Sequence, residues 1–258
     1  MSSVDVSSYL DRPLTTPDAK LLAQIERGPI NPPQALALSD VERLLDPATL
    51  ACETGWCWLP DSVGYVAART AMPAVTGEML DWWFDWHADD PIRYRIWHPL
   101  AHKGNSIERP TGGTSPKAHW GAVHHPVEDV GTGVVHARIA FLTPTEMGMS
   151  TDALDDPHVA TILCGYVGDD TRHVRHTPMF HVALRDGDGV VMRSRFWLGA
   201  ALRPYGPLGG LGKRALNHPY IRRFALPSAL PHALARHCAE EYANLAALLP
   251  ELYERFGP

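Results

Sequence analysis

The chain has 258 residues, 45% of them apolar and 20% charged, which is the composition of a globular protein with a sizeable core. Its formal net charge of −6 disfavours a nucleic-acid partner or an anionic membrane surface, so a small molecule is the expected ligand. No apolar run approaches the roughly 20 residues of a membrane span, and residues 1–11 are too polar for a signal peptide, so we expect a cytoplasmic protein.

The first 60 residues read as a small helical arm or cap. Thr16-Pro17-Asp18 predicts a helix that runs to about Arg27, and residues 39–45 predict another. Helices this short are marginal alone, so we expect them to pack on the main body or on a second subunit. We therefore divide the chain into an arm, residues 1–60, and a main domain, residues 61–258, and expect a homodimer that uses the arm.

The next part of the chain alternates between strand and helix signals. A strand is predicted over Val63–Thr70, and a helix from the N-cap Thr76 to residues 87–90. A further strand is predicted over Ile92–Trp97, followed by a loop to about Gly113.

The middle of the chain is rich in strand patterns. Asp186-Gly-Asp-Gly189 between two of these segments is a hairpin turn signal. The predicted strands are Ala118–Val127, Gly133–Phe141, Ala160–Val167, Phe180–Arg185 and Val190–Leu198.

One long helix is predicted over Leu226–Leu249. Ser228 is a suitable N-cap, Pro231 falls in the first turn, where its missing N–H is tolerated, and Pro250 marks the predicted end. A meandering antiparallel sheet followed by one long helix is the element order of an α+β helix-grip fold, with a cavity between the curved sheet and the helix. An unrelated α+β sandwich with the same order stays open.

Two ionisable residues interrupt the apolar face of this helix. His237 and Glu241 lie one turn apart, so their side chains can converge. A buried, unpaired carboxylate costs several kcal/mol, so Glu241 needs a cation, and a divalent metal would supply it. The alternative is an exposed hydrogen-bonded pair. The positions that share the face are Leu230, Leu234, His237, Glu241, Leu245 and Leu248.

A metal site of this kind needs further ligands from the sheet or its loops. His98 and His102 are rivals, and His98, which precedes Pro99, reads more as a loop residue. His124 and His125 are neighbours on a strand, so at most one of them faces a cavity. Glu128 and its neighbour Asp129 are the candidate carboxylates.

Several spaced segments agree, in order, with the pattern of one known family. They are Asp81-Trp-Trp-Phe-Asp-Trp-His87, Arg93-Tyr-Arg-Ile-Trp97, His102 with Asn105, Glu128, His181 and His237-Cys-Ala-Glu-Glu241. On these segments the chain resembles the diacetylphloroglucinol hydrolase and phloretin hydrolase family over roughly residues 63–249. The resemblance implies a Bet v 1/START-like helix-grip fold behind a helical N-terminal region. It also implies a zinc-dependent hydrolase that cleaves the carbon–carbon bond between a phloroglucinol ring and its acyl group.

The resemblance also implies roles for single residues. Two imidazoles and two carboxylates suit Zn²⁺, although Fe²⁺, Mn²⁺ or Ni²⁺ could take the same donors. His181 is implied as the proton-transfer residue, with Glu128 or Glu241 as the base. Phe196 stands where the family pattern leads us to expect a tyrosine, which bears on substrate preference. The implied metal ligands are His102, Glu128, His237 and Glu241, and the implied contacts to the ring of an aromatic ketone substrate are Tyr94, Asn105, His181 and Phe196.

Other interpretations remain beside these. His181 could be a core histidine and Tyr94 a core aromatic, and the Gly-rich Gly206–Gly212 is interpreted as a mobile cover over the cavity. A non-catalytic carrier of an aromatic or polyketide ligand is the alternative function, because helix-grip cavities often only bind. An iron-dependent oxygenase with the same donors is the third.

Overall fold

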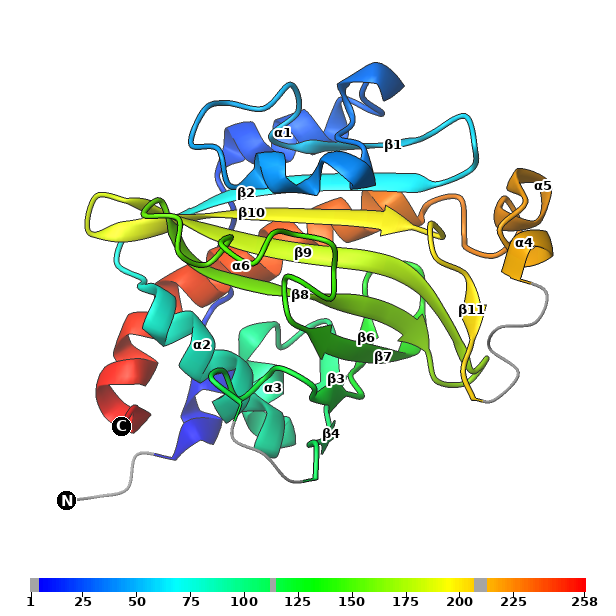
Figure 1. Ribbon diagram of the computed structural model, residues 1–258. Helices are drawn as coiled ribbons and strands as arrows, with labels where there is room; N and C mark the ends of the chain where they lie inside the picture. The colour runs from blue at the N-terminus through cyan, green and yellow to red at the C-terminus, as the bar shows by residue number, and fades with distance from the viewer. Residues whose placement is uncertain (1–4, 112–114, 207–212) are drawn as a thin grey trace.

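An antiparallel sheet curves around the C-terminal helix in the computed structural model, which describes residues 5–111, 115–206 and 213–258 (Figure 1). Most of the strands follow the order β1-β2-β10-β9-β8-β7-β5-β4, with β11 paired to β9, β6 to β7 and β3 to β6. The strands of the described residues are β1 Gly55–Trp58, β2 Gly64–Met72, β3 His102–Gly104, β4 Ile107–Glu108, β5 Val123–His124, β6 Val127–Asp129, β7 Val134–Leu142, β8 Val159–Asp169, β9 Val174–Asp186, β10 Gly189–Leu198 and β11 Arg203–Pro204.

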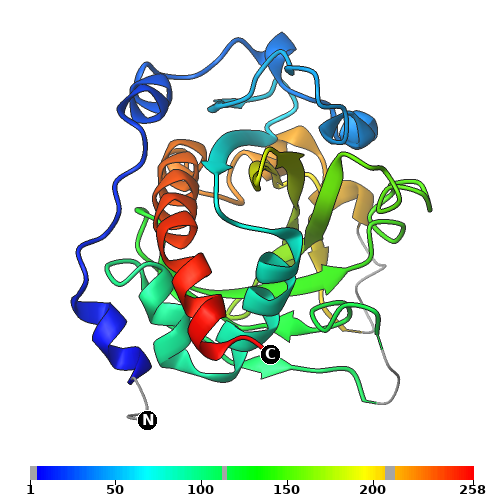
Figure 2. The same ribbon diagram turned by 90° about the vertical axis from the view of Figure 1, so that its left-hand side faces the viewer.

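Helix α6, Leu230–Phe256, lies against the concave side of this sheet, and Figure 2 shows the strands curving away from it on one side. The expected α+β helix-grip fold is thus confirmed. In the described part of the chain no helix is both long and apolar enough to cross a membrane. The other α-helices are α1 Ala19–Glu26, α2 Gly77–Trp86, α3 Pro91–Trp97, α4 Lys213–Leu216 and α5 Pro219–Arg222, and the 3₁₀ helices are η1 Val6–Asp11, η2 Pro32–Gln34, η3 Leu38–Leu44 and η4 His87–Asp89.

Both faces of the central strands are buried, because α6 covers one, and the N-terminal segment and the loop between β7 and β8 cover the other. Val66 and Ala68 of β2 belong to the core formed with α6, whereas Tyr65 and Ala67 pack with residues of η3 on the opposite face. Since successive side chains of a strand point to opposite faces, each central strand contributes to two cores. This explains why every residue of β10 is buried.

The N-terminal segment runs along the outside of the molecule to β1 (Figure 2). Arg12 forms an ion pair of 2.6 Å with Glu251, near the C-terminal end of α6. Glu26, the last residue of α1, lies 3.2 Å from His232 at the other end of α6. The division at residue 60 stays a prediction; β1 lies before it and pairs with β2.

The predicted strand over Ile92–Trp97 was wrong, because this segment is helix α3. The Asp90 side chain accepts a hydrogen bond from the backbone N–H of Ile92, and Pro91 occupies the first helical position. An N-cap followed by proline is a strong helix start, and here it outweighs the preference of the β-branched and aromatic residues for a strand.

The predicted limits of the long helix were also wrong. Ala229, not Ser228, is its N-cap, and the helix continues through Pro250 to Phe256. Proline removes one backbone hydrogen bond, but the following turn is held by packing. Leu252 is fully buried there, and Glu251 binds the N-terminal arm.

Most of the other predicted elements are confirmed within a few residues. Thr76 caps α2, and the hairpin turn at residues 186–189 joins β9 to β10. The predicted strand Ala118–Val127 was too long, since strand structure there is confined to β5 and the first residue of β6. The predicted cover Gly206–Gly212 lies, apart from Gly206, outside the described residues.

Candidate active site

A cavity of about 330 Å³ opens between the concave face of the sheet and the first half of α6. One part of its wall is apolar and the other carries buried polar groups, an arrangement that suits an amphipathic organic ligand. The apolar part includes Val167, Leu198, Leu226, Leu230 and Leu234. The polar part includes His87, Tyr94, Asn105, His124, Glu128, His181, His237 and Glu241.

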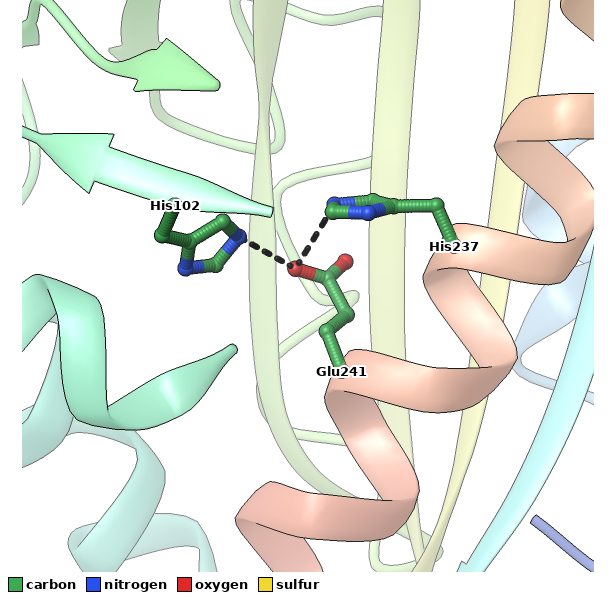
Figure 3. Close-up of side chains that lie close together, drawn as sticks. All are labelled: His102, His237 and Glu241. Carbon is green, nitrogen blue, oxygen red and sulfur yellow. Dashed lines mark ion pairs between the residues drawn. The ribbon is translucent and has the colours of Figure 1, made fainter. Parts of the chain in front are cut away.

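Three potential metal ligands meet at this cavity (Figure 3). His237 and Glu241 come from successive turns of α6, and His102 comes from the start of β3. One oxygen of Glu241, Oε2, lies 3.6 Å from Nε2 of His102 and 3.6 Å from Nε2 of His237. All three donor atoms lie within 4.8 Å of one another, and all three residues are buried.

The donor set fits a divalent cation. Zinc bonds of 2.0–2.2 Å in a tetrahedron place neighbouring ligand atoms roughly 3.4 Å apart, close to the 3.6 Å separations here. The backbone carbonyl of Tyr94 is 3.1 Å from Nδ1 of His102. A carbonyl can only accept, so Nδ1 carries the proton and Nε2 presents a lone pair, as in metal-binding histidines. That buried Nε2 has no hydrogen-bond partner among the described residues.

The electrostatics of the cluster favour an ionised carboxylate. Burial alone would raise the pKa of Glu241, but His237 and His102 outweigh burial and hold that pKa far below its usual range. Burial lowers the pKa of His237, yet the Glu241 carboxylate raises it above the usual value. Burial lowers the pKa of His102, which keeps this imidazole neutral and able to ligate.

Glu128 borders this cluster without joining its tightest group. Its Oε2 lies 3.6 Å from Nε2 of His102 and accepts a hydrogen bond of 2.5 Å from the Tyr94 hydroxyl. Burial first, and then the charge of Glu128, hold the pKa of Tyr94 well above its usual value. The rival carboxylate, Asp129, instead accepts hydrogen bonds from the backbone N–H groups of Gly131 and Gly133, in a turn.

His98 lies behind His237 rather than beside the donor atoms. The backbone N–H of Ala101 donates to its Nδ1 over 3.2 Å, which leaves the proton on Nε2, 3.4 Å from a carboxylate oxygen of Glu240. Its ring stacks on that of His237 at 5.2 Å. Of the two rivals, the structure therefore brings His102 into the cluster and leaves His98 to support it.

The remaining predicted residues also line the cavity. Nδ1 of His181 is 2.7 Å from the Ser194 hydroxyl, and burial lowers the pKa of His181 to about 4. The Phe196 ring packs edge-on against His181 at 5.4 Å. The two side-chain polar atoms of Asn105 are buried and have no hydrogen-bond partner in the described chain.

The structure separates the neighbouring histidines of β5. His124 lines the cavity, whereas His125 points away from it and pairs with Asp170. His87 was missed as a cavity residue by the sequence analysis. Its place one turn beyond Trp83 and Phe84, on the inner face of the predicted helix, was the signal that could have found it.

The chain is similar in sequence to two hydrolases and, loosely, in structure to an aromatase/cyclase. Phloretin hydrolase of Eubacterium ramulus is 28% identical over 253 residues, which cover 95% of this chain and 88% of that protein. The 2,4-diacetylphloroglucinol hydrolase of Pseudomonas protegens is 27% identical over 259 residues, covering 91% and 79% respectively. Among solved structures, the Zhui aromatase/cyclase of Streptomyces sp. R1128 matches with a TM-score of 0.41 and 15% identity, over 75% of this chain and 97% of that one.

The match to a family model decides the relationship. A TM-score of 0.41 is a loose likeness, so the helix-grip assignment rests on the strand order and on α6. The model of the DAPG hydrolase PhiG domain covers residues 36–254, which include β1 to β11 and nearly all of α6. The chain belongs to the DAPG hydrolase PhiG domain family.

Proposed function

We propose that this protein is a metal-dependent hydrolase that cleaves the carbon–carbon bond between a phloroglucinol ring and its acyl group. The observation that carries the proposal is the buried convergence of His102 with His237 and Glu241, two residues of the cavity wall, in a chain of this family. The substrates are C-acylphloroglucinols, such as phloretin or mono- and diacetylphloroglucinol. The products are the phloroglucinol and a carboxylic acid.

The proposed cofactor is Zn²⁺, with Fe²⁺, Mn²⁺ or Ni²⁺ as less favoured occupants. His102, His237 and Glu241 would hold it, with Glu128 as the fourth ligand. When bound, such an ion polarises oxygen atoms and lowers the pKa of a water molecule toward neutrality.

The chemistry depends on the ring hydroxyls. An aryl carbanion is a poor leaving group, but a phloroglucinol ring can take a proton on the carbon that bears the acyl group. The resulting keto tautomer is in effect a β-diketone, so attack of water on the acyl carbonyl becomes a retro-Claisen cleavage. The ring carbon leaves with the electron pair of the broken bond as a stabilised enolate, and the acyl carbon becomes the carboxylic acid.

His181 is the proposed proton-transfer residue. Its pKa of about 4 makes the imidazole neutral near pH 7, so it relays a proton from a ring hydroxyl to the ring carbon rather than supplying one. The Ser194 hydroxyl at Nδ1 fixes the orientation of the ring. Tyr94 and Asn105 hold the ring hydroxyls, and Glu128 or Glu241 takes the proton of the attacking water.

The first test is anaerobic incubation of metal-analysed protein with phloretin and with monoacetylphloroglucinol, followed by mass spectrometry. We expect phloroglucinol and the matching acid, lost on chelation and regained with Zn²⁺. A protein that binds these compounds unchanged would be a carrier. Oxygen uptake during turnover in air would instead indicate an oxygenase.

Replacement of one ligand tests the metal site directly. Glu241→Gln should reduce bound metal and activity together, because the amide offers a neutral donor where the cation needs a carboxylate. Glu254→Gln is the matched control, since Glu254 is an exposed glutamate near the other end of α6. Full activity with metal intact in Glu241→Gln would remove this residue from the site.

Two further expectations complete the proposal. We place the enzyme in the cytoplasm and expect it to act as a homodimer. Light scattering of the purified protein measures the second, and a monomeric mass at assay concentration would contradict it.

A further inference from the structure

A ring nitrogen of His124 is buried without a hydrogen-bond partner in the described chain. Its side chain lines the cavity and is 3% exposed, and Nε2 has no hydrogen-bond partner among the described residues. A buried polar group without a partner costs about 1–3 kcal/mol. Such a cost at a cavity wall is recovered when a ligand supplies the missing hydrogen bond.

The register of the sheet puts His124 beside Asn105. Ile107 of β4 is directly opposite His124 of β5, and the N–H of His125 donates to the carbonyl of Ser106. Asn105 precedes Ser106, just before β4 begins, and its side chain lines the cavity as that of His124 does. Asn105 also has unpartnered polar atoms in the described chain. Together they form a polar patch, Asn105 and His124, on one wall.

A row of aromatic contacts separates this patch from the metal ligands. The ring of His102 stacks on that of Tyr94, with 4.0 Å between the ring centroids. The Tyr94 ring stacks on that of His87 at a centroid distance of 5.8 Å, and the His87 ring contacts that of His124 edge-on at 5.5 Å. A substrate whose acyl carbon lies at the ligand cluster can therefore extend its ring along this row. The acyl chain needs no hydrogen bonds and suits the apolar wall at Leu230 and Leu234.

We propose that His124 is a specificity-determining residue, which hydrogen-bonds a ring hydroxyl remote from the scissile bond. The inference rests on the proposed function for the identity of the ligand. Burial keeps the imidazole neutral, so it offers one donor and one acceptor to a hydroxyl.

The experiment measures binding of the product ring rather than turnover. Phloroglucinol, with three hydroxyls, and resorcinol, with two, are titrated calorimetrically into zinc-loaded protein and its variants. His124→Phe keeps a flat ring but removes the hydrogen bond, and His124→Gln keeps a polar group near the position of Nε2.

We expect His124→Phe to weaken phloroglucinol binding about tenfold. Resorcinol should lose less than about twofold, because it can turn its unsubstituted carbon toward residue 124. His124→Gln should recover most of the lost affinity. A purely structural role would weaken both ligands equally, and that result would overturn the inference.

His119→Phe is the matched control. His119 is buried and packs on Phe141, as His124 does, but it does not line the cavity. It should leave the ratio of the two affinities unchanged. Failure of the unaltered protein to bind phloroglucinol would overturn the inference. Binding with the expected ratio but no cleavage of any acylphloroglucinol would contradict the proposed function alone.

Discussion

At the scale of single residues, Phe196 is the position at which we expect a side chain outside the proposed metal site to affect substrate preference. It is buried on the cavity wall beside His181 and contributes no hydrogen-bonding group of its own. A ring hydroxyl placed against it would lose its hydrogen bond to water and gain nothing. Ligands with fewer hydroxyls on that side should therefore be tolerated.

Restoring a hydroxyl at this position is a direct test. Phe196→Tyr should lower the KM for monoacetylphloroglucinol by roughly two- to tenfold, the value of one net hydrogen bond. Phe196→Leu, which changes shape without adding a polar group, is the control. Steady-state kinetics give the KM of both variants for monoacetylphloroglucinol. An unchanged or higher KM in Phe196→Tyr would show that no substrate hydroxyl lies against residue 196.

Helices α3 and α6 must be held together for the ligands to meet, and Asn244 links them. Its Nδ2 donates to the backbone carbonyls of Ile96 and Trp97 at the end of α3, and its Oδ1 accepts from the N–H of Thr15. The indole N–H of Trp97 donates in turn to the backbone carbonyl of Glu241. This connection fixes the distance between the segment that carries His102 and the helix that carries its partners.

Asn244→Asp should break this link while keeping the acceptor for Thr15. The two carbonyls of α3 lose their buried donor and face a carboxylate, so the free energy of unfolding should fall by about 1–3 kcal/mol or more. Metal affinity should fall as well. Denaturant unfolding and zinc titration measure the two, and Ala247→Ser, at an exposed position of α6, is the control. Unchanged values in Asn244→Asp would rule out this role.

At the scale of the whole molecule, several buried histidines make stability depend on pH. Burial lowers the pKa of His87 and His119 to about 3, and that of His181 to about 4. These values lie below the 6.5 of an unfolded chain, so the neutral form is favoured in the fold. Their stabilising effect is complete above pH 6.5 and is lost as the pH falls toward 4 to 3, because the unfolded chain takes up protons first.

Each of these three histidines should lower the free energy of unfolding at pH 5 by about 2 kcal/mol relative to pH 8. Thermal unfolding of metal-free protein, with a chelator present, should therefore show a marked drop in Tm between these pH values. His119→Phe removes one titrating group that belongs to neither the ligand cluster nor the cavity wall, so it should reduce the loss of stability between pH 8 and pH 5 by about 2 kcal/mol. An identical slope in this variant would show that His119 is not buried in neutral form.

Local sequence patterns were sufficient to predict the helices and strands in which apolar residues recur at a regular spacing. The period of α6 placed His237 and Glu241 on its buried face, and strand patterns with a Gly-rich turn gave the β9–β10 hairpin. These predictions succeed because a helix face and a strand face are set by neighbours a few residues apart. The resemblance to the family added the residues that spacing alone could not select.

The tertiary structure decided what depends on distant partners. His102 reaches its neighbours on α6 across more than a hundred residues, and no local pattern distinguishes it from His98. The register of β5 against β4 decided that His124, and not His125, faces the cavity. Packing carried α6 beyond Pro250, because Leu252 is buried there by the rest of the fold. The sequence determined which faces are apolar and which groups are ionisable; the folded chain decided which of those groups meet, since only burial against a second element fixes a side chain's partners.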